Sequence, residues 1–339
     1  MSGGHRRARA ALKSRRIALL AVAALVLPLA ACSQAHTAAD DAAAGTRPQV
    51  VVTTNILGDV ASEIAGDSID VTTLMKPNAD PHSFEISAQQ AAALDSADLV
   101  VSNGLGLEEG LQRHLDRAAA AGVEQFVAGA EIDPLSYASG ADHAAPQGPN
   151  GSAVADPHFW TDPRQMVTVA RALTDALAAL PSLSDDARAA IAARGSAYAQ
   201  GLEDLDAALA ERFAEIPRQQ RALVTNHHVF GYFAQRYDFT VLGTAIPGGT
   251  TLAAPSAADL DALVTAITDA GVPTIFAESS SPDRLMRVLA DEAGITVNVV
   301  PLFTESLSEP GGGAESYLEM VSTNADRIVS GLTPRQPRQ

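Results

Sequence analysis

The sequence predicts an α/β protein made of two (β/α) lobes with parallel sheets, joined by one long rigid helix. Three observations favour this fold class. Strand-like and helix-like segments alternate from Pro48, a second cycle of the same kind starts at Arg221, and one long helical segment separates the two cycles. Such alternation is typical of parallel sheets, because crossover helices cover both of their faces.

Residues 1–31 are predicted to be a signal peptide rather than part of the fold. Six basic residues precede an apolar run over Ile17–Leu29. That run is shorter than the roughly 20 apolar residues of a membrane-spanning helix. The pair Arg15-Arg16 leaves a twin-arginine export signal open as an alternative.

Cys32 is the only cysteine of the chain, and it directly follows Leu29-Ala30-Ala31. This arrangement resembles the bacterial lipoprotein signal, in which the cysteine becomes the lipidated first residue. An ordinary secretory cleavage site is the alternative. We therefore expect Cys32 to be lipidated, residues 32–48 to form a flexible tether, and the protein to lie on the extracytoplasmic face of the cell membrane.

The charge of the chain excludes one class of partner. The formal net charge is −17, and removal of residues 1–31 takes away six basic residues and no acidic ones, which leaves −23. We therefore expect no nucleic acid as a partner. An acidic surface raises the local concentration of cations, although it also serves solubility.

The first lobe is predicted over residues 49–183. Its opening alternates short β-branched runs with apolar residues at helical spacing. The pattern predicts strands over 50–53, 69–71 and 97–101, and helices over 56–64 and 107–120.

The segment 184–216 is predicted to be a linking helix. Ser184 is a good N-cap with acidic residues in the first turn behind it, and Pro217 follows the end. A helix of this length extends about 45 Å at about 1.5 Å per residue, which is enough to run along both lobes. Gly195 and Gly201 weaken the helical propensity without cancelling the pattern.

The second lobe is predicted over residues 217–339. Its opening echoes the first lobe, since Val52-Thr53-Thr54-Asn55 and Val224-Thr225-Asn226 both end a strand. This similarity suggests a weak internal duplication, although chance is an alternative. The predicted elements are strands over 221–225, 240–242, 274–276 and 297–300, and a helix through Phe230 and Phe233.

Three of the eight histidines lie where loops or helices begin: His82 and His158, each in an Asp-Pro-His tripeptide, and His227 after Asn226. In open α/β sheets such junctions converge on the crevice where ligands bind. His228 follows His227 directly, so only one of this pair is expected to face a common site. Each histidine taken alone is more often a surface residue, but three at such junctions favour a metal site.

A site of neutral imidazoles also needs an anionic donor. Imidazoles leave the charge of a dication uncompensated, and a carboxylate ligand lowers the cost of burying it. Glu305, which follows the last predicted strand, is the best-placed candidate. An acid that only stabilises a helix start is the alternative.

Four segments carry a resemblance to the ZnuA/TroA-like metal-binding lipoproteins. In order, they are Asn78-Ala79-Asp80-Pro81-His82-Ser83-Phe84-Glu85, Asp156-Pro157-His158-Phe159-Trp160, His227–Phe233 and Phe303-Thr304-Glu305-Ser306-Leu307. The resemblance implies two lobes joined by one backbone helix, with a metal in the cleft between them. It implies that His82 and His158 are the ligands of the first lobe, and that His227 and Glu305 are the ligands of the second.

The family binds zinc or manganese and supplies ABC importers. The resemblance therefore implies a monomeric solute-binding lipoprotein that delivers a cation to a permease and its ATPase. Histidine at position 227, where manganese-type relatives tend to have glutamate, favours Zn²⁺, and Mn²⁺ is the alternative. Glu305 stands where many relatives have aspartate, and the loop 137–155 lacks the His/Asp-rich run of many zinc-specific members.

Two other functions remain as alternatives to import. Three histidines and a carboxylate could form a hydrolytic metal centre, but the sequence has no His-Glu-x-x-His run and no separate general base. Four protein ligands would also close the coordination sphere, so we expect no enzyme. A surface adhesin on the same scaffold is the second alternative.

Overall fold

The structure, a computed structural model, describes residues 47–137, 154–246, 248–294 and 297–333. The predicted signal peptide, the tether up to residue 46 and Cys32 lie outside the described residues. No helix in the described ranges is long and apolar enough to span a membrane.

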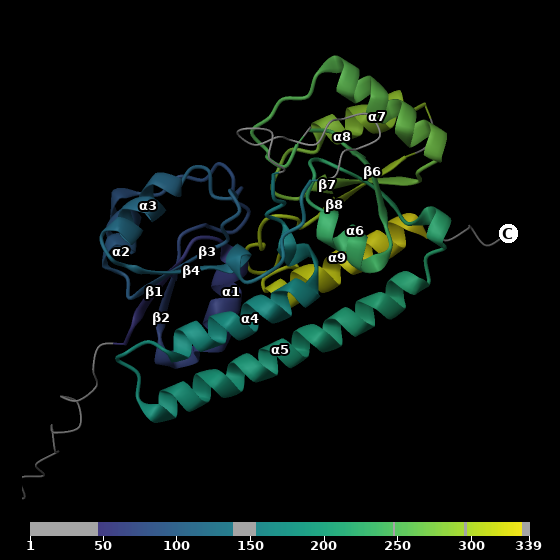
Figure 1. Cartoon of the computed structure of the whole chain (residues 1–339). Coiled ribbons are helices and arrows are strands. Elements are labelled where there is room, and N and C mark those ends of the chain that lie inside the picture. Colours follow the sequence, from purple (N-terminus) through teal and green to yellow (C-terminus); the bar gives the residue numbers. More distant parts are fainter. Residues whose placement is uncertain (1–46, 138–153, 247, 295–296, 334–339) are drawn as a thin grey trace, which may run out of the picture. The chain divides into compact units, whose positions relative to one another are not determined.

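The first half of the chain contains a four-stranded parallel sheet (Figure 1). The strands are β1 (Gln49–Val52), β2 (Asp70–Thr73), β3 (Leu99–Ser102) and β4 (Glu124–Val127), in the order β2-β1-β3-β4. The helices are α1 (Asn55–Ala65), α2 (Ala88–Ser96) and α3 (Gln112–Ala120). Both faces of the sheet are covered, since Val50 and Val52 belong to one apolar cluster and Val51 belongs to another.

In the described residues of the second half there are two parallel strand pairs and four α-helices. The strands are β5 (Ala222–Thr225) with β6 (Thr240–Thr244), and β7 (Thr274–Glu278) with β8 (Asn298–Leu302). The helices are α6 (Gly231–Tyr237), α7 (Ala257–Ala270), α8 (Arg284–Glu292) and α9 (Tyr317–Leu332). The predicted fold class, two α/β lobes with parallel sheets, is confirmed; the residue boundaries of the lobes stay a prediction.

Two long helices, α4 (Pro163–Ala178) and α5 (Asp185–Ala214), lie side by side and run along one side of both halves of the chain (Figure 1). The predicted N-cap is present, because the Ser184 side chain accepts a hydrogen bond from the backbone N–H of Ala187 at 3.2 Å. Helix α5 packs against α1 and against α9, which come from opposite ends of the chain. One continuous apolar core therefore reaches from Val50 to Leu332.

The helix predicted over 107–120 begins later, at Gln112. The buried Glu108 carboxylate accepts hydrogen bonds from the Thr53 hydroxyl at 2.7 Å and from the backbone N–H groups of Asn103 at 2.7 Å and Gly104 at 3.1 Å. These bonds fold the chain after β3 into turns around the carboxylate. The apolar spacing of this stretch thus comes from packing and not from a helix.

The two glycines of α5 have different roles. A Cβ at Gly195 would lie 2.0 Å from the Thr174 hydroxyl oxygen, and Thr174 is held by donating a hydrogen bond to Ala170 O at 2.6 Å. A Cβ at Gly201 would meet nothing within 4 Å. Gly195 therefore permits the close approach of α4 and α5, whereas Gly201 only costs helical propensity.

We expect Gly195→Ala and Gly201→Ala to change stability in opposite directions. The first forces a methyl group against Thr174 and lowers the free energy of unfolding by about 1–3 kcal/mol. The second removes backbone freedom from the unfolded chain and raises it by about 0.5–1 kcal/mol. Urea denaturation of both variants measures the changes, and shifts of the same sign would contradict this account of the helix contact.

Candidate metal site

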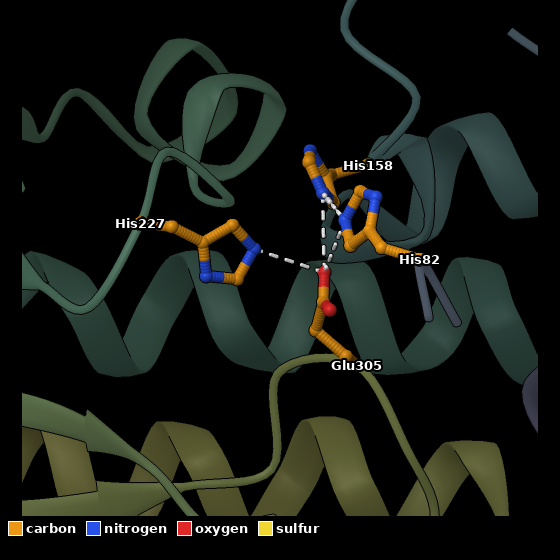
Figure 2. Close-up of side chains that lie close together, drawn as sticks. All are labelled: His82, His158, His227 and Glu305. Carbon is orange, nitrogen blue, oxygen red and sulfur yellow. Dashed lines mark hydrogen bonds and ion pairs between the residues drawn. The ribbon is translucent and has the colours of Figure 1, made fainter. Parts of the chain in front are cut away.

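Four side chains from distant parts of the sequence meet at one point, as Figure 2 shows. The Oε1 atom of Glu305 lies 3.4 Å from Nε2 of His82, 3.1 Å from Nε2 of His158 and 3.0 Å from Nε2 of His227. All four side chains are at most 1% exposed. The structure thus brings together all four residues that the sequence analysis selected.

The four residues occupy the predicted junctions. His227 follows β5 and Glu305 follows β8, so both lie beyond the carboxyl ends of parallel strands. His158 directly precedes a short 3₁₀ helix, Phe159–Thr161, and His82 lies in a turn after β2. Loops at strand ends, rather than helix faces, therefore hold the donors.

The two Asp-Pro-His tripeptides share one local structure. The backbone N–H of His82 donates to Asp80 Oδ1 at 2.8 Å, and that of His158 donates to Asp156 Oδ1 at 3.0 Å. The sequence analysis did not identify this role of the aspartate. The spacing of two residues between aspartate and histidine was the available signal, because aspartate commonly accepts from the N–H two residues on.

Asp156 also fixes the ring of His158. Its Oδ1 lies 2.7 Å from His158 Nδ1. A hydrogen bond from Nδ1–H to this carboxylate leaves Nε2 facing the other three donors, which is the usual orientation of a metal-binding histidine. Burial would lower the pKa of His158, but the hydrogen bond and charge of Asp156, together with Glu305, raise it to about 9.

The raised pKa sets the sign of two pH dependences. Because it lies above the ordinary value of 6.5, protonated His158 stabilises the fold fully below about pH 6.5, and this contribution is lost as the pH rises through about 9. The affinity for a cation has the opposite dependence on pH. The cation must displace the proton of His158, so the affinity rises as the pH rises.

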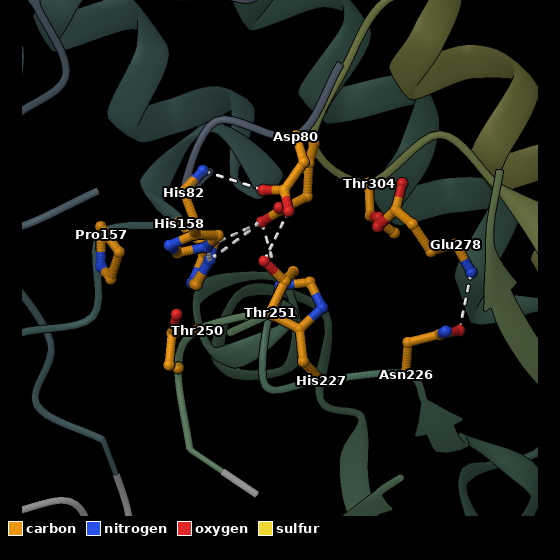
Figure 3. Close-up of polar contacts among 12 residues, drawn as sticks. Asp80, His82, Pro157, His158, Asn226, His227, Thr250, Thr251, Glu278 and Thr304 are labelled. Carbon is orange, nitrogen blue, oxygen red and sulfur yellow. Dashed lines mark hydrogen bonds and ion pairs between the residues drawn. The ribbon is translucent and has the colours of Figure 1, made fainter. Parts of the chain in front are cut away.

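Asp80 is used differently from Asp156. Its Oδ2 accepts hydrogen bonds from the hydroxyls of Ser83 at 2.9 Å and Thr251 at 2.6 Å, and Figure 3 shows Asp80 beside His82 and Thr251. His82 Nδ1 has no hydrogen-bond partner among the described residues, and Glu109 Oε1 lies 3.7 Å from it. His82 is therefore held less firmly at its outer nitrogen than His158.

The loop that carries Glu305 is fixed by residues from the first half of the chain. Asn55 donates to Ser306 Oγ at 2.7 Å and accepts from Leu307 N–H at 3.0 Å. Trp160 Nε1–H donates to Thr304 O at 2.8 Å. These contacts set the position of the carboxylate relative to the three imidazoles.

Tyr137 closes another side of the site. Its hydroxyl donates to Gly249 O at 3.2 Å and lies 3.4 Å from His158 Nδ1. His228 packs edge-on against the Tyr137 ring at 5.3 Å between centroids and is not among the four donors, so one histidine of the adjacent pair faces the site, as predicted. No sequence signal indicated Tyr137.

The electrostatics of the cluster favour a cation. Burial alone would raise the pKa of Glu305, but the charge of His227 and hydrogen bonds from all three histidines hold it well below its ordinary value. Zn²⁺ bonds of roughly 2.0–2.1 Å in a tetrahedron place neighbouring donors roughly 3.3 Å apart. The separations of 3.0–3.4 Å between Glu305 Oε1 and the three imidazole nitrogens fit that geometry.

The fold and the four donors define a two-lobed α/β protein with a buried three-histidine, one-carboxylate cluster suited to a divalent metal. Residues 50–331 match the family model described as ZnuA, the periplasmic zinc-uptake complex component A. The chain therefore belongs to this family.

Individual relatives cover nearly the whole chain. The zinc-binding protein TroA of Treponema pallidum is 32% identical over 86% of this chain and 91% of that protein. The manganese-binding lipoprotein MntA of Halalkalibacterium halodurans is 26% identical over 91% of this chain and 96% of that protein. The solved structure of the T. pallidum periplasmic zinc-binding protein TroA matches with a TM-score of 0.75 at 28% identity, covering 84% of this chain and 99% of that one.

We expect Asp156→Asn to change the number of protons released when the protein binds Zn²⁺ at pH 8. Without the carboxylate, burial lowers the pKa of His158, so the release falls by about one proton per cation. Calorimetric titrations in two buffers of different ionisation enthalpy measure the release.

Asp80→Asn is the matched control for this measurement. Asp80 occupies the same place in its tripeptide, but within the described residues its carboxylate accepts from the His82 backbone N–H and from the hydroxyls of Ser83 and Thr251, and not from an imidazole nitrogen. Its variant should release as many protons as the parent, and an equal loss in both variants would disprove the role given to Asp156.

Proposed function

We propose that this chain captures a divalent transition metal outside the cytoplasm and delivers it to an ABC import permease and its ATPase. The convergence of three imidazole nitrogens and one carboxylate oxygen in a buried cluster carries this proposal. The names of the relatives support it, since they include a zinc-binding protein and substrate-binding lipoproteins of manganese ABC transporters.

Zn²⁺ is the cation that the donor set favours. Three nitrogens and one oxygen in a tetrahedral arrangement are typical of zinc sites. Zn²⁺ also binds more tightly than Mn²⁺ at sites of nitrogen and oxygen donors. Mn²⁺ is the second candidate, because MntA and PsaA relatives are named for manganese.

Binding rather than catalysis is the role that the site supports. Four protein ligands would complete a tetrahedral coordination sphere and would leave no open position for a reactive water. The relatives named above are binding proteins by their names. A hydrolase and an adhesin are therefore weaker alternatives.

The experiment that tests this function is a metal-dependent melting curve. Zn²⁺ at about 100 times its dissociation constant should stabilise the folded protein by about 2.7 kcal/mol. His82→Ala and His227→Ala should lose this stabilisation, whereas His114→Ala, on α3 and outside the cluster, should keep it. Competition between Zn²⁺ and Mn²⁺ then decides the cation.

The proposal is wrong if neither cation raises the melting temperature, or if the two cluster variants bind as tightly as the parent. Retention of Mn²⁺ against equimolar Zn²⁺ would overturn only the choice of zinc.

We also propose that the mature protein is a monomer anchored to the membrane by lipid on Cys32. Replacement of this residue, Cys32→Ser, removes the thiol that would carry the lipid. The protein should then move from the membrane fraction to the soluble fraction after cell breakage, with its metal binding intact. An unchanged membrane fraction would rule out this anchor.

A further inference from the structure

Glu278, outside the four-donor cluster, carries a buried carboxylate oxygen that nothing in the described residues satisfies. This residue ends β7 and is 5% exposed. Its backbone N–H donates to Asn226 Oδ1 at 2.7 Å (Figure 3). Its Oε1 accepts from the Ser280 hydroxyl at 2.9 Å. Its Oε2 has no partner among the described residues. The residue is thus firmly placed while one oxygen stays free to bind.

The side chain of Glu278 lines a cavity that reaches the cluster. The cavity has a volume of about 550 Å³, and His227 is part of its wall. The other lining residues are Asp80, Asn226, Ile246, Thr251, Ser281, Pro282, Arg284, Leu285 and Val288. By contrast, the space beside Glu305 and Trp160 measures about 10 Å³, which is barely enough for one water molecule.

The charges on the cavity wall favour a cation near Glu278. Asp80 and Glu278 are its acidic groups, and Arg284 is exposed at its edge. Both oxygens of Asp80 already accept hydrogen bonds. Glu278 Oε2 is therefore the acidic oxygen of this wall that is free to bind a cation, among the described residues. Burial, together with the charge of Glu305, raises the pKa of Glu278, so a cation beside this carboxyl group would stabilise its ionised form.

A cation that enters the cluster must lose its water. All four donors are almost fully buried, so the exchange of water for protein ligands takes place away from bulk solvent. A dication in such a place is costly unless a carboxylate binds it during the exchange. Glu278 supplies a free carboxylate oxygen in the cavity that also contains one of the four donors.

We propose that Glu278 is a transfer ligand, which binds the cation in the cavity and passes it to His227 and the other three donors, and binds it again on release. This role rests on the proposed metal-binding function. A transfer ligand speeds binding and release equally, because it stabilises the path and not the final complex.

Stopped-flow exchange of Zn²⁺ with a fluorescent chelator tests the role. In Glu278→Gln, both the association and the dissociation rate constants should fall about tenfold, with the dissociation constant unchanged. The glutamine can still accept from Ser280, so the fold should be retained. Glu278→Asp keeps the charge but withdraws the oxygens by one methylene group, and it should slow exchange as well.

Asp59→Asn is the matched control, since Asp59 is a half-buried acid on α1 with a pKa raised by burial to about 6, and it does not line the cavity. It should exchange at the parent rates. Parent rates in Glu278→Gln, parent rates in Glu278→Asp, or a change in the dissociation constant alone would each overturn the transfer role. Failure of the parent protein to bind Zn²⁺ tightly would instead overturn the proposed function.

Discussion

The contact of one carboxylate oxygen with three imidazoles, all four side chains being at most 1% exposed, is the constraint on which the rest of the structure depends. Glu305 could not be buried as an anion without positive charge beside it. The proton on His158, whose pKa is raised by Asp156 and Glu305, supplies positive charge there, and a bound cation would supply it instead. Cation binding would therefore displace this proton.

A shared core, rather than a flexible linker, sets the distances within the cluster. The apolar core extends from β1 to α9, and α5 packs against elements from both ends of the chain. Asn55 and Trp160 add polar contacts that fix the backbone on both sides of Glu305. Donors from four distant segments thus belong to one packed unit, in which a small shift of any segment changes the coordination geometry.

The sequence predicted the features that depend on local patterns. The strand and helix order, the N-cap of α5 and the four donors all follow from periodicity, capping residues and short motifs. The late start of α3 was not predicted. In the sequence Glu108 resembles an exposed helix residue, and only the structure shows that its carboxylate accepts hydrogen bonds from Thr53 and Asn103, which follow β1 and β3. Glu278 likewise reads as the polar end of a strand, and only the tertiary structure reveals its free oxygen.

The two Asp-Pro-His tripeptides show that the same short motif does not hold its histidine ring equally firmly in both places. In both, the aspartate holds the histidine backbone in the same way. Asp156 then binds the His158 ring, whereas Asp80 turns its second oxygen to Thr251, which follows β6 in the second half of the chain. One copy therefore orients an imidazole and the other connects the two halves of the chain, so the position of His82 depends on the contact between the halves more than that of His158 does.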